Sequence, residues 1–139
     1  MHKELPVHTV FLSLGTNLGD RNLYLDTAIG QIALRLGRII AQSSIHETPP
    51  WGFESTQQFL NMVVRIETRL LPRQLLFITQ AIEQEMGRKE KSQGTYKDRV
   101  IDIDILFYDE LELHTTELIL PHPRYLEREF VLAPLSEVL

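Results

Sequence analysis

Two aspartates, Asp102 and Asp104, stand in an otherwise apolar run with Ile103 between them. Isoleucine, valine and phenylalanine favour an extended chain, in which residues two apart project from the same face. Both carboxylates should therefore point the same way, with their Cα atoms about 7 Å apart. Ile101, Ile103 and Ile105 should face a core on the other side. Neighbouring carboxylates repel each other unless a cation lies between them, so the pair predicts a Mg²⁺ site.

A basic segment leads into this run. Residues 88–99 carry five basic side chains against two acidic ones, although the chain has a net charge of −5. An acidic protein with one basic segment indicates a binder of a small anionic ligand, and argues against general binding of nucleic acid or anionic membranes. Together the acids and the basic segment favour the handling of phosphates. The same acids also fit a solvent-facing sheet edge whose charges serve only solubility.

The bulk properties limit the class of protein. A chain of 139 residues is one domain by length, so we expect a single domain over residues 1–139. The lack of cysteine excludes a disulfide framework and a thiolate metal site. No apolar run is long enough for a membrane span, and the polar N-terminus lacks a signal-peptide core, which predicts a cytoplasmic location.

Hydrophobic periodicity predicts the order of the elements. We expect strands at 8–14, 38–46, 58–67 and 100–107, helices from Asp20 (or Asn17) to Gly37 and from 72 to 86, and short pieces at 117–120 and 124–139. Residues 15–19 should form a loop, and the first helix should bury one stripe: Leu25, Ala28, Ile29, Ile32, Ala33 and Leu36. The order βαββαβ is typical of an α+β, ferredoxin-like sandwich, an antiparallel sheet with both helices on one face. The fold hosts unrelated functions, so it does not decide the chemistry.

The third strand offers a second candidate site. In 58–67 one face should carry Leu60, Met62, Val64 and Ile66, and the other Phe59, Asn61, Val63 and Arg65. An aromatic ring beside an amide suits a flat heterocycle, through stacking and hydrogen bonding. Alternatively, Phe59 packs under a loop and Asn61 satisfies backbone there. The nearby loop from Thr48 to Gly52, with the single tryptophan Trp51, is either a structural corner or a wall over a ligand.

Other candidates lie on the second helix and near the C-terminus. Leu76, Gln80 and Glu83 share one helix face, which fits a ligand surface or an ordinary solvated face. His122 lies between two prolines, and the five histidines show no zinc spacing. Arg124 and Arg128 follow it. Because the chain lacks a P-loop and a protein-kinase signature, phosphates must be held by arginine, lysine and metal.

Six motifs in this order resemble the 6-hydroxymethyl-7,8-dihydropterin pyrophosphokinase family of folate biosynthesis. They cover nearly the whole chain, at residues 11–21, 47–52, 59–61, 83–88, 98–106 and 120–135. The resemblance implies transfer of a diphosphate from ATP to the hydroxymethyl group of the pterin, with release of AMP. It also implies small-molecule substrates, with no nucleic-acid or membrane partner.

The resemblance also implies roles for individual residues. Asp102 and Asp104 match the family's aspartates that hold two Mg²⁺ ions, and with Arg88 and Arg99 they are the expected catalytic residues. The expected pterin-binding residues are Thr48, Pro49, Trp51, Phe59, Asn61 and Phe130. The expected ATP-binding residues are Leu76, Gln80, Glu83, Arg88, Lys91, Arg99, Ile105, His122 and Arg128.

Three departures from the family pattern and two rival functions stay open. Glu90 stands where many relatives carry an arginine, Gly94 looks like an added residue, and Phe59 replaces a tyrosine of some members. A non-catalytic ligand sensor of the same fold and a two-metal phosphohydrolase are rival functions, the second disfavoured by the scarcity of histidine. We expect a monomer, because every apolar stripe is assigned to the core.

Overall fold

The computed structural model describes residues 5–48, 58–87 and 100–139. Its elements in chain order are β1 (His8–Thr16), α1 (Arg21–Arg35), β2 (Arg38–Gln42), β3 (His46–Thr48), β4 (Phe59–Thr68), α2 (Pro72–Glu85), β5 (Asp102–Tyr108), β6 (Leu113–His114), β7 (Ile119–Leu120), the 3-10 helix Tyr125–Glu127 and α3 (Glu129–Ser136). Within these ranges no helix is long and apolar enough to cross a membrane.

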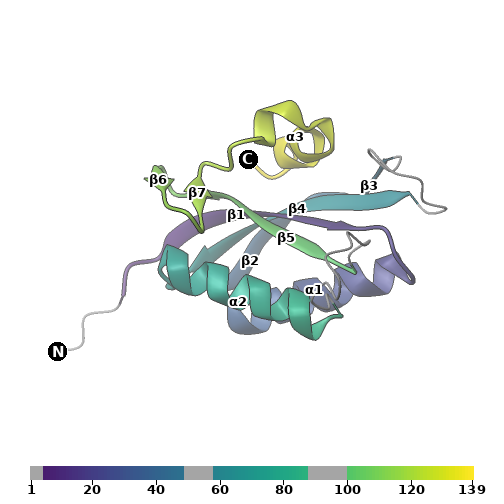
Figure 1. Ribbon diagram of the computed structural model, residues 1–139, viewed down its shortest axis with the longest axis horizontal. Helices are drawn as coiled ribbons and strands as arrows, with labels where there is room; N and C mark the ends of the chain where they lie inside the picture. Colours follow the sequence, from purple (N-terminus) through teal and green to yellow (C-terminus); the bar gives the residue numbers. More distant parts are fainter. Residues whose placement is uncertain (1–4, 49–57, 88–99) are drawn as a thin grey trace.

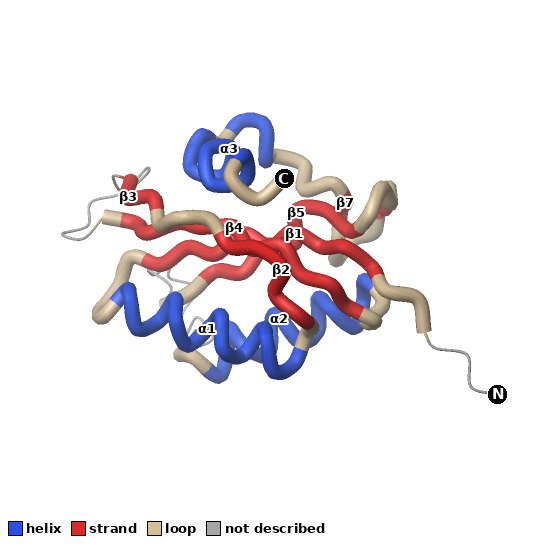
Figure 2. Tube along the Cα trace, turned by 180° about the vertical axis from the view of Figure 1, so that it is seen from behind, coloured by secondary structure: helices blue, strands red, loops and turns tan. Residues whose placement is uncertain are grey.

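The sheet follows the order β2-β4-β1-β5, and each neighbouring pair is antiparallel. β3 pairs with β4 beyond the end of β2, and β6 and β7 form a separate antiparallel pair. Figure 1 shows α1 and α2 together on one face of the sheet and α3 on the opposite face, and the view from behind in Figure 2 shows the same layers. This α+β arrangement confirms the ferredoxin-like fold expected from the sequence.

The main core lies between the sheet and the pair α1 and α2. Alternate residues of each strand face this core, because successive side chains of a strand point to opposite faces. The buried strand residues include Val10, Leu12, Leu14, Leu60, Met62, Val64, Ile66, Ile101, Ile103 and Ile105. One stripe of each helix meets them, contributed by Leu25, Ala28, Ile32, Leu75 and Ile82. The predicted alternation of the third and fourth main strands is confirmed.

A smaller apolar cluster lies on the other face, beneath α3. Val63 of β4 and Leu106 of β5 pack there against Val131, Leu135 and Val138 of the C-terminal segment. α3 therefore covers part of the sheet face that α1 and α2 leave open, and carries its own share of buried apolar surface.

A β-bulge lets β5 serve both clusters. Phe11 pairs with Phe107 and Leu12 pairs with Ile105, so Leu106 is an extra residue opposite β1. Leu106 and Phe107 consequently both pack against the α3 cluster, whereas Ile105 remains in the main core. After the aspartates, the bulge shifts by one residue which side chains of β5 face each side of the sheet.

The two long helices begin with different caps. The Asp20 side chain accepts a hydrogen bond from the Leu23 N–H at 3.1 Å, so Asp20 caps α1. Leu71 precedes α2 and offers no side-chain acceptor, as expected from its apolar side chain. Instead Gln74 Oε1 accepts a hydrogen bond from the Leu71 N–H at 2.8 Å, and Pro72 occupies the first turn.

The predicted strand at 38–46 is wrong as a single element, because Ser43 interrupts it. The Ser43 N–H donates to the Val63 carbonyl, and the Ser43 hydroxyl accepts from the Val63 N–H, both at 2.9 Å. One residue thus satisfies both backbone groups of Val63, and the chain leaves the line of β2 before β3 begins.

Two smaller expectations are also corrected, and a third is confirmed. Gly15 and Thr16, expected in a loop, extend β1 because they pair with Asn61 and Leu60 of β4. Ala33, expected in the buried stripe of the first helix, is exposed. The expected extended piece near 117–120 is present as β7, which pairs with β6.

Candidate active site

The two aspartates project from the sheet face opposite α1 and α2. Ile101, Ile103 and Ile105 are buried in the main core, so Asp102 and Asp104 between them point to the other face. Both side chains are half-buried. The structure therefore confirms that the carboxylates share one face, with Cα atoms about 7 Å apart along the strand.

Strand register places an amide in the same row as the first acid. Gly15 of β1 pairs with Asn61 of β4 on one side and with Asp102 of β5 on the other. Asn61 and Asp102 are therefore two strands apart, about 10 Å. Ser13, in the next row, pairs with Val63 and with Asp104.

Gly15 lets the side-chain amide of Asn61 lie close to the backbone of β1. A Cβ atom at this position would lie 3.1 Å from Oδ1 of Asn61, closer than ordinary contact. Any other residue would press on the amide. From the sequence, Gly15 is expected in a loop, and this role does not emerge; a glycine inside a strand pattern is the signal that marks a close approach.

Asn61 is buried, with 4% of its surface exposed, and it is held in place from β3. Its Nδ2 donates a hydrogen bond to the Thr48 hydroxyl at 2.9 Å. Thr48 is also the register partner of Phe59, whose side chain is half-buried. The structure thus brings together Thr48, Phe59 and Asn61, as expected for one binding surface.

The segment after β7 brings His122 close to the acids. The His122 N–H donates to the Leu106 carbonyl at 2.9 Å, which docks this segment on β5. Burial lowers the pKa of His122, Asp104 opposes that effect, and Arg128 and Arg124 add to it. The ring is therefore neutral at neutral pH.

The hydrogen bonds of the ring indicate which nitrogen carries the proton. The Arg124 N–H donates to Nδ1 of His122 at 3.2 Å, so the neutral ring carries its proton on Nε2. Arg128 follows, with its guanidinium carbon 5.7 Å from the centre of the Phe130 ring, a cation–π contact. Phe130 itself packs against the cluster beneath α3.

The second helix reaches the strand of the aspartates through Glu83. Glu83 is 4% exposed, and its Oε2 accepts a hydrogen bond from the Ile103 N–H at 2.7 Å. Ile103 lies between the two acids, so Glu83 fixes the backbone that carries them. Gln80, one turn earlier, is exposed, and Leu76 is half-buried beside the main core. Ile105 is buried within that core.

Five of the expected site residues lie outside the described residues: Pro49, Trp51, Arg88, Lys91 and Arg99. Their roles stay predictions.

The donor set suits Mg²⁺ that is shared with a substrate. Among the described residues, no three His, Cys, Asp or Glu side chains gather as a ready-made metal site. Mg²⁺ is commonly held by one or two carboxylates, with substrate phosphates and water as the other ligands. Asp102 and Asp104 fit that pattern.

The fold and site define a ferredoxin-like α+β protein with an acid pair and a buried amide on one sheet face. The family model for 7,8-dihydro-6-hydroxymethylpterin-pyrophosphokinase matches residues 11–139. The chain belongs to this family, and it is a pyrophosphokinase of folate biosynthesis.

Relatives support this assignment. A 2-amino-4-hydroxy-6-hydroxymethyldihydropteridine pyrophosphokinase of Porphyromonas gingivalis is 50% identical over 131 residues, which cover 93% of this chain and 89% of that protein. The enzyme of the same name from Bacillus subtilis is 44% identical over 129 residues, 92% of this chain and 76% of that protein. A crystal structure described as HPPK-DHPS in complex with substrates matches with a TM-score of 0.78 at 19% identity. This likeness covers 96% of the chain but only 40% of that longer chain, and it shows the fold alone.

Proposed function

We propose that this single domain transfers a diphosphate group from ATP to 6-hydroxymethyl-7,8-dihydropterin, in a reaction that depends on Mg²⁺. The products are AMP and the pterin diphosphate. Family membership and the names of the relatives support the pterin substrate and the pyrophosphokinase activity.

The row formed by Asn61, Gly15 and Asp102 carries this proposal. A group that can read a heterocycle and a group that can hold cations are thus two strands apart, about 10 Å, on one sheet face, which supports a site for two adjoining substrates. A pterin ring over Asn61 would direct its hydroxymethyl group towards phosphates over the acids. Binding both substrates side by side replaces an encounter in solution by a fixed approach of the reacting atoms.

On the pterin side, the amide of Asn61 supplies both a donor and an acceptor for the edge of the ring. Phe59 and Phe130 supply aromatic faces for stacking, and Thr48 orients Asn61 through its hydroxyl. Pro49 and Trp51 complete this side in the proposal.

On the nucleotide side, Asp102 and Asp104 would hold the two Mg²⁺ ions. When bound, the ions neutralise phosphate charge and polarise the phosphorus that is attacked. The Nε2–H of neutral His122 is a hydrogen-bond donor for a phosphate oxygen, and Arg128 is a cationic one. Leu76, Gln80, Glu83 and Ile105 bind or support the nucleotide, together with Arg88, Lys91 and Arg99.

The transfer step forms one bond and breaks one. The hydroxymethyl oxygen of the pterin bonds to the β-phosphorus of ATP, and the bond from that phosphorus to the oxygen shared with the α-phosphate breaks. AMP leaves with the shared oxygen, and the hydroxyl proton passes to solvent. Such transfers need positioning and charge neutralisation more than a strong base.

The test is incubation with ATP, Mg²⁺ and the reduced hydroxymethylpterin, followed by separation of the nucleotides. AMP should form in equal amount to the pterin diphosphate, and a chelator should stop the reaction. ADP or orthophosphate as the product would contradict the proposal. We also propose a monomer in the cytoplasm, and size-exclusion chromatography tests the first part.

A further inference from the structure

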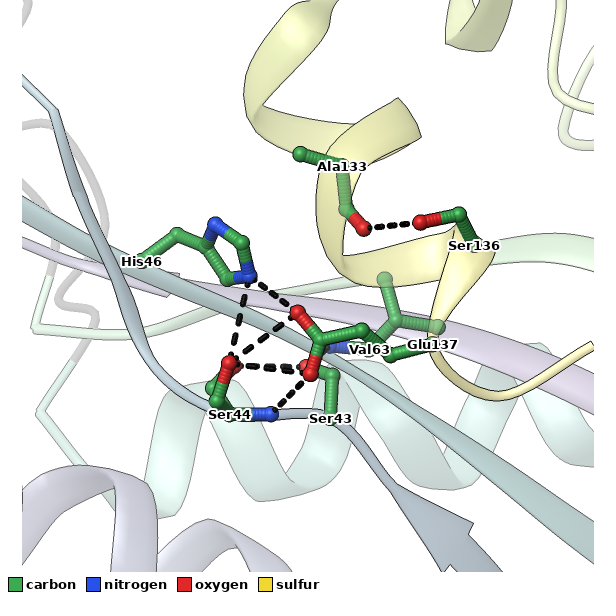
Figure 3. A network of polar contacts seen from close by, with 7 residues as sticks. All are labelled: Ser43, Ser44, His46, Val63, Ala133, Ser136 and Glu137. Atoms are coloured by element: carbon green, nitrogen blue, oxygen red, sulfur yellow. Dashed lines mark hydrogen bonds and ion pairs between the residues drawn. The ribbon is translucent and has the colours of Figure 1, made fainter.

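A group of hydrogen bonds joins the end of α3 to the connection between β2 and β3. We call Ser44, His46 and Glu137 the clasp (Figure 3). One oxygen of Glu137, Oε1, accepts from the Ser44 N–H at 2.8 Å and from the Ser44 hydroxyl at 2.9 Å. The other oxygen, Oε2, lies 2.5 Å from Nε2 of His46. The clasp thus bridges segments about ninety residues apart in the chain.

The position of Glu137 is unfavourable for the helix that it ends. It is the C-terminal cap residue of α3, where the helix dipole disfavours negative charge. The pKa of Glu137 is nevertheless lowered to about 2, first by the Ser44 N–H and then by hydrogen bonds from His46 and the Ser44 hydroxyl. The carboxylate is therefore ionised at neutral pH, and its hydrogen bonds are charge-assisted.

On the β3 side, the clasp is connected through His46 to the buried amide of Asn61. His46 is the register partner of Asn61, and Thr48, two residues further along β3, accepts the Asn61 hydrogen bond. β3 is only three residues long, and within the described residues it pairs with β4 alone. So short a strand with one neighbour has few hydrogen bonds that hold it in place. A contact at its start therefore contributes more to its position.

On the α3 side, the clasp is connected through Glu137 to the helix that carries Phe130. Phe130 lies seven residues before Glu137, so both residues lie on the same side of α3 two turns apart. Phe130 packs against the cluster that contains Val63 and Leu135. The clasp therefore joins the end of the helix that carries Phe130 to the strand that carries Thr48.

We propose that Glu137 is a positioning residue for the pterin side of the site, which it supports by holding β3 and α3 together through Ser44 and His46. The inference rests on the proposed function, because the pterin is the ligand that these elements would contact. A purely structural clasp would affect folding without distinguishing the two substrates. The clasp proposed here makes the pterin the more sensitive ligand, because most of the nucleotide side lies on β5 and α2, whereas Arg128 at the N-cap of α3 is farther along the helix from Glu137.

The chain offers a matched control at the opposite end of the sheet. Asp109 accepts from the Thr9 N–H at 2.7 Å, and its other oxygen lies 2.7 Å from Nδ1 of His8. This carboxylate also joins a backbone N–H and a histidine, but it lies at the far end of β5 from Asp102. Asp109→Asn and Glu137→Gln therefore make the same chemical change at two ends of the fold.

The experiment is calorimetry of the full chain with two ligands. ATP analogue binding is measured with Mg²⁺, and binding of the reduced hydroxymethylpterin is measured in the presence of the analogue. Glu137→Ala should weaken pterin binding about tenfold and nucleotide binding less than about twofold. Glu137→Gln, which keeps an acceptor for the Ser44 N–H, should lose about threefold. Asp109→Asn should change neither affinity.

Steady-state kinetics give a second readout. Glu137→Ala should raise the KM for the pterin and leave the KM for ATP unchanged. Equal losses for both ligands, or unchanged pterin affinity in a folded Glu137→Ala protein, would overturn the inference. If that variant does not fold, Glu137→Gln and Ser44→Ala decide the question by the same measurements. A parent protein that binds no pterin would instead overturn the proposed function, and the inference with it.

Discussion

The two faces of the sheet are covered in different ways. α1 and α2 cover one face along its length, and the strand residues beneath them are apolar and fully buried. On the other face, α3 covers the part around Val63 and Leu106, while the half-buried carboxylates of Asp102 and Asp104 lie beyond that cluster. Among the described residues, the first face thus holds most of the buried apolar surface, and the second carries the polar groups of the candidate site. Substitutions on the two faces should separate stability from activity.

Asp104→Ala should have the largest effect, and the effect should be on activity. Removing one carboxylate of the pair should lower kcat by about 10³-fold or more at millimolar Mg²⁺, because phosphate charge is no longer neutralised. Unfolding in urea should show a stability near that of the parent, since the side chain faces away from the core. Turnover within about tenfold of the parent would remove the metal role from Asp104.

Leu12→Ala tests the opposite face of β1. Leu12 is fully buried beneath the helices, so its truncation should lower the free energy of unfolding by about 2–5 kcal/mol. Ser13→Ala, on the site face of the same strand, is the matched control; it removes only a buried hydroxyl and should change stability by about 1 kcal/mol or less. Equal losses of unfolding free energy in the two variants, measured with urea, would mean that the two faces contribute equally to stability.

Asn61→Ala should affect binding more than stability. Loss of a buried hydrogen-bonding amide should weaken pterin binding by about 1–3 kcal/mol, measured by calorimetry. Asn22→Ala makes the same change at an exposed position on α1 and should leave binding as it is. Unchanged pterin affinity in Asn61→Ala would show that the ring is read elsewhere.

The smallest expected effect is the loss of unfolding free energy at low pH that results from protonation of Glu137. Its pKa is about 2 in the fold and 4.5 in an ordinary environment, so the unfolded chain binds the proton first as the pH falls. The stabilisation is complete above pH 4.5 and is lost as the pH falls through about 2. The parent should therefore lose unfolding free energy over this range more steeply than Glu137→Gln, which has no such group to titrate. Parallel pH profiles from urea unfolding would contradict this.

The sequence predicted the faces of the strands better than their partners. Alternation in β4 and β5 correctly separated Asn61 and the aspartates from the core, because burial imposes a period of two on a strand. It did not predict that Gly15 lies between Asn61 and Asp102, since register depends on pairing between distant segments. Those residues matched by resemblance that lie in the described ranges could be placed in the fold, but the pattern alone did not define their contacts.

Two further features escaped prediction for the same physical reason. Ser43 has ordinary strand neighbours, and only its hydrogen bonds to Val63 show why β2 ends there. Glu137 is a charged residue near the C-terminus, which usually means a solvated position. Its function in the clasp depends on Ser44 and His46, and no local pattern connects residues so far apart in the chain.

Leu106, the extra residue in β5, affects how this strand aligns with β1. Sliding β5 by two positions along β1 would keep every side chain on its own face, so alternation alone does not prevent such slippage. It would, however, move Leu106 away from Val131 and Leu135, against which the bulge now packs it. A misaligned β5 would lose the contact of Leu106 with the C-terminal helix. The bulge therefore favours the pairing with β1 that places Asp102 and Asp104 at the site.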